Sequence, residues 1–183
     1  MNKSLLTIGM FVLLVSTVVN AIMIRENRKL TAQTASLRSQ LMVSTGSLLP
    51  ALKGVNLGGK PIVVDSKDAE HPTVVFVFSP TCGVCLKNWP NWNSILESQA
   101  KSGWRPVFVN VGSHASPDFL RSHGLEHYSV VEDVTNDTLL SYRLFHTPQT
   151  IVLNRRGEVE YIWDGALSPA SMNSLSKALT NTN

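Results

Sequence analysis

The chain has 183 residues, of which 43% are hydrophobic and 16% are charged, and its formal net charge is +3. This length suffices for one globular domain with an additional segment, and the composition excludes a disordered chain. The basic residues form no long run interleaved with aromatic residues, so we expect no nucleic-acid partner. Two cysteines are too few for a secreted scaffold held by several disulfides. The fold must therefore be stabilised by its own hydrophobic core.

Residues 5–24 carry no formal charge and follow a single lysine, Lys3. A helix of this length reaches roughly 30 Å, which is the thickness of the hydrocarbon core of a bilayer. We therefore expect residues 1–24 to form a signal anchor, a single transmembrane helix. A cleaved secretory signal is the alternative, because the small residues around Val19-Asn20-Ala21 suit a signal peptidase.

The next segment, residues 25–46, is polar and is expected to form an exposed helical spacer. One stripe of this helix would be formed by residues at alternating steps of four and three, over too short a length to specify a coiled coil: Leu30, Thr34, Leu37 and Leu41. Three basic residues begin the spacer, Arg25, Arg28 and Lys29. The positive-inside rule alone would keep the following domain in the cytoplasm, although a long translocated domain can override this bias.

The segments after the spacer begin the domain that we expect to occupy residues 47–183. Two short strands are predicted within residues 49–64, joined by a turn at Gly58-Gly59. The run Thr73–Phe78 contains only β-branched and aromatic residues, and prolines lie close to both of its ends. This run predicts a central strand that is buried on both faces.

Strands and helices alternate through the rest of the chain. The helix after the central strand has Trp89 and Trp92 at core spacing and contains Pro90, which should kink it. Further strands are predicted at 107–111, 130–131, 149–153 and 158–163, and further helices at 136–144, at 168–179 and from Ser116. This order predicts an α/β domain with one mixed sheet between helices.

The two cysteines, Cys82 and Cys85, lie where the central strand gives way to a helix. A disulfide across two intervening residues restricts the unfolded chain very little, so the spacing indicates redox chemistry rather than a structural bridge. At a helix N-terminus, unpaired N–H groups and the helix dipole would favour the thiolate of Cys82. A zinc site would need two further ligands, and no histidines have ligand-like spacing, so we expect no metal.

Residues 47–179 resemble the thioredoxin-like superfamily, and within it the membrane-tethered TlpA/ResA-type thiol-disulfide oxidoreductases. The resemblance is carried by Cys82-Gly83-Val84-Cys85 after a strand, by Pro90 five residues later and by Thr147-Pro148 before a strand. The predicted N-terminal hairpin is similar to the extension of the TlpA-like branch. The approach Ser79-Pro80-Thr81-Cys82 is also similar to that of the narrower MauD type.

The resemblance implies a thioredoxin-like fold in which Cys82 is the nucleophile and Cys85 the resolving thiol. These two cysteines would form the redox-active disulfide, and no other cofactor is implied. Thr147-Pro148 would be a cis-proline loop that binds an extended segment of a client protein. His146 immediately precedes this loop and would therefore lie close enough to influence Cys82, although an ordinary exposed histidine is the alternative. The residues expected to support the site are Pro80, Thr81, Gly83, Val84 and Pro90.

The sequence departs from the family pattern at four positions. Thr81 stands where thioredoxins usually have tryptophan, and Val84 stands where proline is common. Phe76 and Asn88 occupy the two positions where relatives keep a carboxylate that handles protons. The resemblance therefore specifies neither a redox potential nor a proton route.

The expected function is thiol-disulfide exchange with protein cysteines, on the extracytoplasmic (periplasmic) side of the inner membrane. By analogy with the family, the leading role is a reductant in cytochrome c or other redox-enzyme maturation, with a membrane thiol-disulfide protein as electron donor. A client-binding module without turnover is the alternative from another class. A peroxiredoxin-like peroxidase is disfavoured, because Thr81 adjoins Cys82 instead of lying three residues before it.

Overall fold

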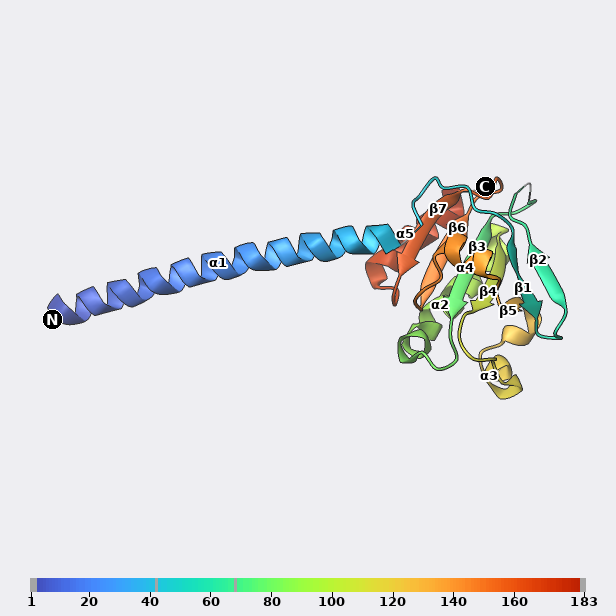
Figure 1. Ribbon diagram of the computed structural model, residues 1–183, viewed down its shortest axis with the longest axis horizontal. Helices are drawn as coiled ribbons and strands as arrows, with labels where there is room; N and C mark the ends of the chain where they lie inside the picture. The colour runs from blue at the N-terminus through green and yellow to red at the C-terminus, as the bar shows by residue number, and fades with distance from the viewer. Residues whose placement is uncertain (1–2, 42, 68, 182–183) are drawn as a thin grey trace. The chain divides into compact units, whose positions relative to one another are not determined.

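The computed structural model describes residues 3–41, 43–67 and 69–181, and it separates into two compact units, Met1–Leu41 and Met42–Asn183. The described part of the first unit is one helix, α1 (Lys3–Leu41), in Figure 1 the long blue helix. Its segment Ile8–Thr34 is long and apolar enough to cross a membrane, with a mean hydropathy of 2.0. This property fits the expected anchor, and a secretory signal sequence has it too.

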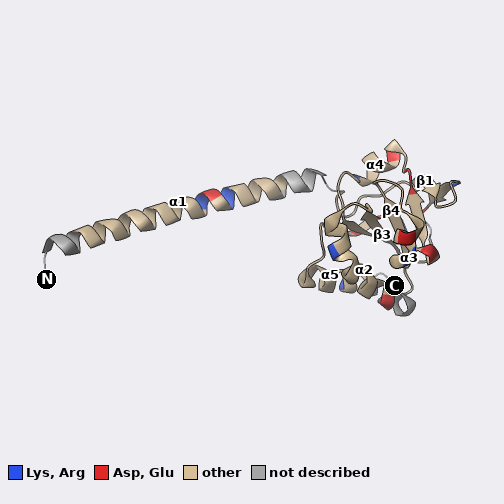
Figure 2. Ribbon diagram, turned by 90° about the horizontal axis from the view of Figure 1, so that it is seen from below, with Lys and Arg blue, Asp and Glu red and all other residues tan. Residues whose placement is uncertain are grey.

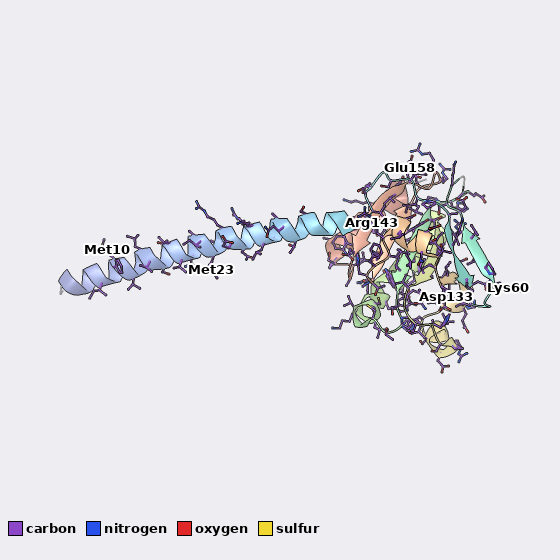
Figure 3. All side chains as sticks on the ribbon, in the orientation of Figure 1. Met10, Met23, Lys60, Asp133, Arg143 and Glu158 are labelled. Carbon is purple, nitrogen blue, oxygen red and sulfur yellow. The ribbon has the colours of Figure 1, made fainter. Side chains whose placement is uncertain are left out.

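The large apolar side chains of α1 whose burial is described, between Ile8 and Leu30, are exposed. Met10 and Met23, for example, are 65% and 66% exposed, and Figure 3 shows both side chains projecting from the helix. Figure 2 shows one short segment of blue and red residues in the part of α1 that it colours, and this segment corresponds to residues 25–29. The predicted spacer continues the same helix as far as Leu41, although the side chains of Leu37 and Leu41 lie outside the described residues.

The second unit contains a seven-stranded mixed sheet in the order β2-β1-β5-β4-β3-β6-β7, whose strands are visible in Figure 1. Strands β3, β4 and β5 are parallel, and the other neighbouring pairs are antiparallel. The strands are β1 (Leu52–Asn56), β2 (Pro61–Val64), β3 (Thr73–Phe78), β4 (Arg105–Asn110), β5 (Ser129–Glu132), β6 (Gln149–Leu153) and β7 (Val159–Asp164). The helices are α2 (Gly83–Ser102), α3 (Pro117–Ser122), the 3-10 helix η1 (Leu125–His127), α4 (Asn136–Tyr142) and α5 (Pro169–Asn181). The predicted fold class, an α/β thioredoxin-like domain with one mixed sheet, is confirmed.

Strand β3 supplies side chains to two hydrophobic clusters, one on each face of the sheet. Phe76 and Phe78 point into the cluster formed with α2 and α5, which includes Trp89, Trp92 and Leu175. Val75 and Val77 point into the opposite cluster, beside Leu52 of β1 and Tyr142 of α4. Every residue of β3 is buried, which confirms the prediction of a central strand and follows from the alternation of side chains along a strand.

The N-terminal hairpin joins the sheet through β1, which pairs with β5 as well as with β2. Gly54 is required at this junction, because a Cβ there would lie 2.6 Å from the carbonyl oxygen of Glu132 and from the side chain of Val131. The turn between β1 and β2 is closed by Asn56, whose side chain accepts hydrogen bonds from the N–H groups of Gly58 and Lys60. The predicted hairpin turn is therefore correct.

Several element boundaries differ from the sequence prediction by one or two residues, and two of these differences have a clear structural reason. The helix expected through Leu144 ends at Tyr142, because Arg143 adopts a left-handed conformation with φ of 51°. The N–H of Leu144 then donates to the carbonyl of Leu139 and closes the helix end. Strand β4 begins at Arg105 rather than at residue 107, because the N–H of Arg105 donates to the carbonyl of Pro72 just before β3.

Candidate redox site

Cys82 lies at the point where the chain leaves β3 and enters α2. Its N–H donates to the carbonyl of Ser79 at 3.1 Å, and its own carbonyl accepts from the N–H of Leu86 at 3.1 Å. The second bond is the first of the helical pattern, so Cys82 occupies the N-cap position of α2. Its side chain is half-buried, and both cysteines are free thiols.

The environment of Cys82 favours the thiolate. Burial alone would raise the pKa of this thiol, but its hydrogen bonds with Cys85, with Thr147 and with the N–H of Val84 outweigh burial and hold the pKa below its usual value. In one of these bonds the backbone N–H of Cys85 donates to Cys82 Sγ, with 3.2 Å between the nitrogen and the sulfur. An N-terminal helix position supplies such donors without any acid or base nearby.

Cys85 has the opposite character. It lies one helical turn after Cys82 and is only 2% exposed. Burial, followed by the hydrogen bond with Cys82, raises the pKa of Cys85 to about 11. Cys82 therefore deprotonates first and is the thiol that solvent and other molecules reach.

The Thr147–Pro148 segment lies beside Cys82, although the two are far apart in the sequence. The pairing of β3 with β6 brings them together, because Val77 is opposite Gln149 in this register. The Thr147–Pro148 peptide bond is cis, as the resemblance implied. The thiol of Cys82 donates to the carbonyl of Thr147 at 3.6 Å, and the carbonyl of Pro148 accepts from the N–H of Gly165 at 2.8 Å.

The segment that approaches the cysteines is held by local hydrogen bonds and by a close contact. The hydroxyl groups of Ser79 and Thr81 lie 3.1 Å apart. Gly112, in the loop after β4, packs so closely against Ser79 that a Cβ at this position would overlap the serine hydroxyl. Four of the expected supporting residues lie within two positions of Cys82 in the sequence: Pro80, Thr81, Gly83 and Val84. The fifth, Pro90, lies inside α2.

The two positions that lack the family carboxylate have structural roles in this chain. Phe76 is fully buried and stacks on Phe108 with ring centroids 5.0 Å apart. Asn88 is also fully buried, and its Oδ1 accepts from the N–H of Leu167 at 2.8 Å and from Asn91 at 3.1 Å. Asn88 thus ties α2 to the loop before α5 and provides no titratable group near Cys85.

A carboxylate that the sequence analysis did not consider does lie at this end of the sheet, one residue beyond the predicted final strand. Asp164 is the last residue of β7, and its Oδ1 lies 2.6 Å from Nε2 of His146, two residues before Pro148. The signal that could have identified it is the register of the final hairpin, which places Asp164 opposite Gln149 at the start of β6.

A second buried acid holds the loop after β4. Glu132, the last residue of β5, accepts hydrogen bonds from Asn110 at 2.8 Å and from the N–H of Ala115 at 2.9 Å, and it lies 3.1 Å from His114. Burial alone would raise the pKa of Glu132, but these hydrogen bonds outweigh it and keep the pKa below its usual value. Within the described residues, no three His, Cys, Asp or Glu side chains are grouped as metal ligands.

A dithiol at a helix N-terminus that faces a cis-proline, at one end of the inner strands of a mixed sheet, defines a thioredoxin-like protein. Residues 45–162 match the AhpC/TSA family, and the chain belongs to this family. A curated relative, a thioredoxin-like protein from Haemophilus influenzae, is 28% identical over 115 residues, which cover 62% of this chain and 66% of the relative. The match thus spans slightly less than two thirds of that protein.

Solved structures with thiol-disulfide names share the fold. A protein described as thiol:disulfide interchange protein DsbE from Chlorobium tepidum aligns with a TM-score of 0.59 and 18% identity, over 76% of this chain and 98% of that one. The thioredoxin domain of a thiol-disulfide oxidoreductase from Bacteroides vulgatus gives 0.58 and 20%, over 77% and 99%. StoA from Bacillus subtilis gives 0.54 and 19%, over 72% and 97%. The chain thus has the fold of thiol-disulfide oxidoreductases.

Proposed function

We propose that this protein is a membrane-anchored thiol-disulfide oxidoreductase that acts on the cysteines of other proteins. The observation that carries the proposal is the pairing of Cys82, whose pKa is lowered at the N-terminus of α2, with a cis-proline loop whose Thr147 carbonyl lies 3.6 Å from Cys82 Sγ. A structural disulfide would need neither an accessible low-pKa thiol nor this loop.

The exchange follows from the different environments of the two thiols. The Cys82 thiolate attacks one sulfur of a client disulfide, forms a mixed disulfide and releases the other client sulfur as a thiolate. Cys85, after losing its proton, attacks Cys82 Sγ and releases the second client sulfur. The client gains two electrons and the protein becomes a Cys82–Cys85 disulfide. The reverse sequence would oxidise a client dithiol, and the pair needs no further cofactor.

The client segment would bind along the cis-proline loop. Among the described residues, none accepts a hydrogen bond from the N–H of Thr147. An extended peptide can pair with this group as a short added strand, which would place its own cysteine near Cys82. Pro148 is buried beneath this position, so the loop offers its backbone rather than a flexible side chain.

The apolar segment of α1 supports an anchored protein, and the resemblance to the TlpA/ResA group is the ground for placing its domain outside the cytoplasm. The segment Ile8–Thr34 would hold the domain at the inner membrane, with the redox site on the periplasmic side. A membrane thiol-disulfide protein would return electrons to the Cys82–Cys85 disulfide. By resemblance to the TlpA/ResA group, the clients would be proteins of cytochrome c maturation or, for the MauD type, of another redox enzyme.

The test uses the full-length protein in detergent and a peptide that contains a disulfide. The reduced wild type should reduce the peptide, Cys82→Ser should abolish the reaction, and Cys85→Ser should accumulate a mixed disulfide visible by mass spectrometry. An equilibrium titration against glutathione should show one two-electron transition that both substitutions remove. A protein that binds clients but shows no such transition would be a binding module, and the proposed function would be wrong.

A further inference from the structure

Two polar side chains beside the redox site have no part in the exchange chemistry described above. His146 immediately precedes Thr147, and its Nε2 lies 2.6 Å from Oδ1 of Asp164. The same nitrogen lies 2.9 Å from the side-chain amide of Gln149. The side chain of His146 is 31% exposed and that of Asp164 is 13% exposed, so this contact is largely withdrawn from solvent and is stronger than a surface pair.

These contacts connect the cis-proline loop to the end of the final hairpin. Asp164 holds His146 from β7, and the next residue, Gly165, donates its N–H to the carbonyl of Pro148 at 2.8 Å. Gln149 is fully buried, and its side chain donates to the carbonyl of Arg143 at 3.3 Å. The loop is therefore tied on both sides of Thr147, while Thr147 itself contacts Cys82.

Leu144 and Pro148 are buried at the two ends of the loop, but residues 145–147 between them have little apolar packing that could replace these ties. Phe145, the residue before His146, is 58% exposed, and Thr147 is only half-buried. The conformation of the backbone at residues 145–147 thus depends mainly on hydrogen bonds. Because loop segments with few buried apolar contacts open most easily, loss of the His146–Asp164 contact should loosen the Thr147 backbone first.

We propose that His146 and Asp164 are positioning residues that hold the Thr147 backbone in the conformation required for an extended peptide client. The pair thereby makes the protein selective for disulfides within peptide segments over small disulfides, which reach Cys82 without pairing to Thr147. This inference rests on the proposed function, because it assigns a client-binding role to the same loop. Most of the hydrogen bonds that lower the pKa of Cys82 come from Cys85 and Val84 on α2, and one comes from Thr147. The bonds from α2 do not depend on the pair, so the pair acts on client binding far more than on the intrinsic reactivity of Cys82.

The experiment compares two oxidants for the reduced full-length protein in detergent. One is a disulfide peptide with extended flanks, and the other is 5,5′-dithiobis(2-nitrobenzoate), a small reagent. His146→Ala and Asp164→Ala should each lower the rate constant with the peptide by about tenfold, since small errors of alignment are costly in such reactions. The rate constant with the small reagent should fall much less than tenfold, because the donors on α2 are untouched and only the hydrogen bond from Thr147 is affected.

Three further variants separate positioning from a general loss of structure. The double variant should be no slower than either single variant, because both remove the same contact. Asp164→Asn keeps an acceptor oxygen and should restore most of the peptide rate. His71→Ala is the matched control, since His71 pairs with Glu70 at 4.0 Å before β3, at the opposite end of that strand from Cys82, and both side chains are exposed. If an alanine variant melts early, His146→Phe fills the same space without a donor.

The outcomes are distinguishable. Equal loss with both reagents, unchanged rates with the peptide, or an Asp164→Asn variant as slow as Asp164→Ala would each overturn the positioning role. A wild type that reacts with the small reagent but never with the peptide would instead overturn the proposed function.

Discussion

The burial of Cys85 makes a specific prediction about stability at alkaline pH. Its thiol is 2% exposed, and burial, followed by the hydrogen bond with Cys82, raises its pKa from the ordinary 9.0 to about 11. In the unfolded chain the thiol ionises near its ordinary value, whereas in the folded domain it stays neutral. The contribution of the neutral Cys85 thiol to folding stability is therefore fully present below pH 9 and is lost as the pH rises from about 9 to 11. Each pKa unit is equivalent to about 1.4 kcal/mol, so the loss is at most about 3 kcal/mol.

Urea unfolding of reduced residues 43–183 at pH 8, 9 and 10 measures this loss, with a non-thiol reductant present. The wild type should lose stability across this range, and Cys85→Ala should not show that part of the loss. Cys82→Ala is the matched control: it keeps the buried thiol of Cys85 and should retain the larger part of the loss, which comes from burial, although it lacks the smaller part that comes from the hydrogen bond with Cys82. Tyr142, whose pKa burial also raises, contributes equally to all three proteins and cancels in the comparison. Equal alkaline losses in Cys85→Ala and Cys82→Ala would refute the reasoning.

Three further predictions concern stability and can be measured by urea unfolding at neutral pH. Glu132→Ala should cost about 1–3 kcal/mol of folding stability, because it leaves buried donors unpaired. This cost should shrink in acid, because the lowered pKa of Glu132 contributes stability that is lost as the pH falls through that pKa. Trp92→Phe removes a fully buried hydrogen bond to Thr150 at 3.0 Å and should cost about 1–3 kcal/mol; a neutral result would contradict this role. Gly54→Ala should cost about 1–3 kcal/mol through the close approach of Glu132, whereas Gly83→Ala, with open space around it, should cost nothing.

The fold could be predicted largely because its central elements have strong local signals. Thr73–Phe78 contains no polar residue except its first, and β-branched residues on both faces indicate a strand covered on both sides. Trp89 and Trp92 follow at helical spacing and are 6% and 0% exposed. By contrast, the end of α4 depends on one left-handed residue, Arg143, and arginine carries no local signal for this conformation.

The candidate site was predictable only where its chemistry lies within one segment or one motif. Only two residues separate Cys82 from Cys85, and the Thr147–Pro148 pair belongs to a family pattern. The contact of His146 with Asp164 depends on the register of β6 with β7, which contains an irregularity between Val152 and Leu153. A single shift of register would place a different residue of β7 beside the loop, so the sequence pattern could not specify this partner.

The register of β3 against β6 has a consequence for how the two halves of the site stay together. A slip of two residues would keep every side chain on its own face, and thus would not be opposed by the hydrophobic pattern. It would nevertheless move Pro148 about 7 Å along the strand from Cys82, since each residue advances the strand by about 3.4 Å. The hydrogen bond from Trp92 on α2 to Thr150 on β6 fails in the slipped pairing. A buried hydrogen bond between α2 and β6 thus favours the one register that places Pro148 beside Cys82.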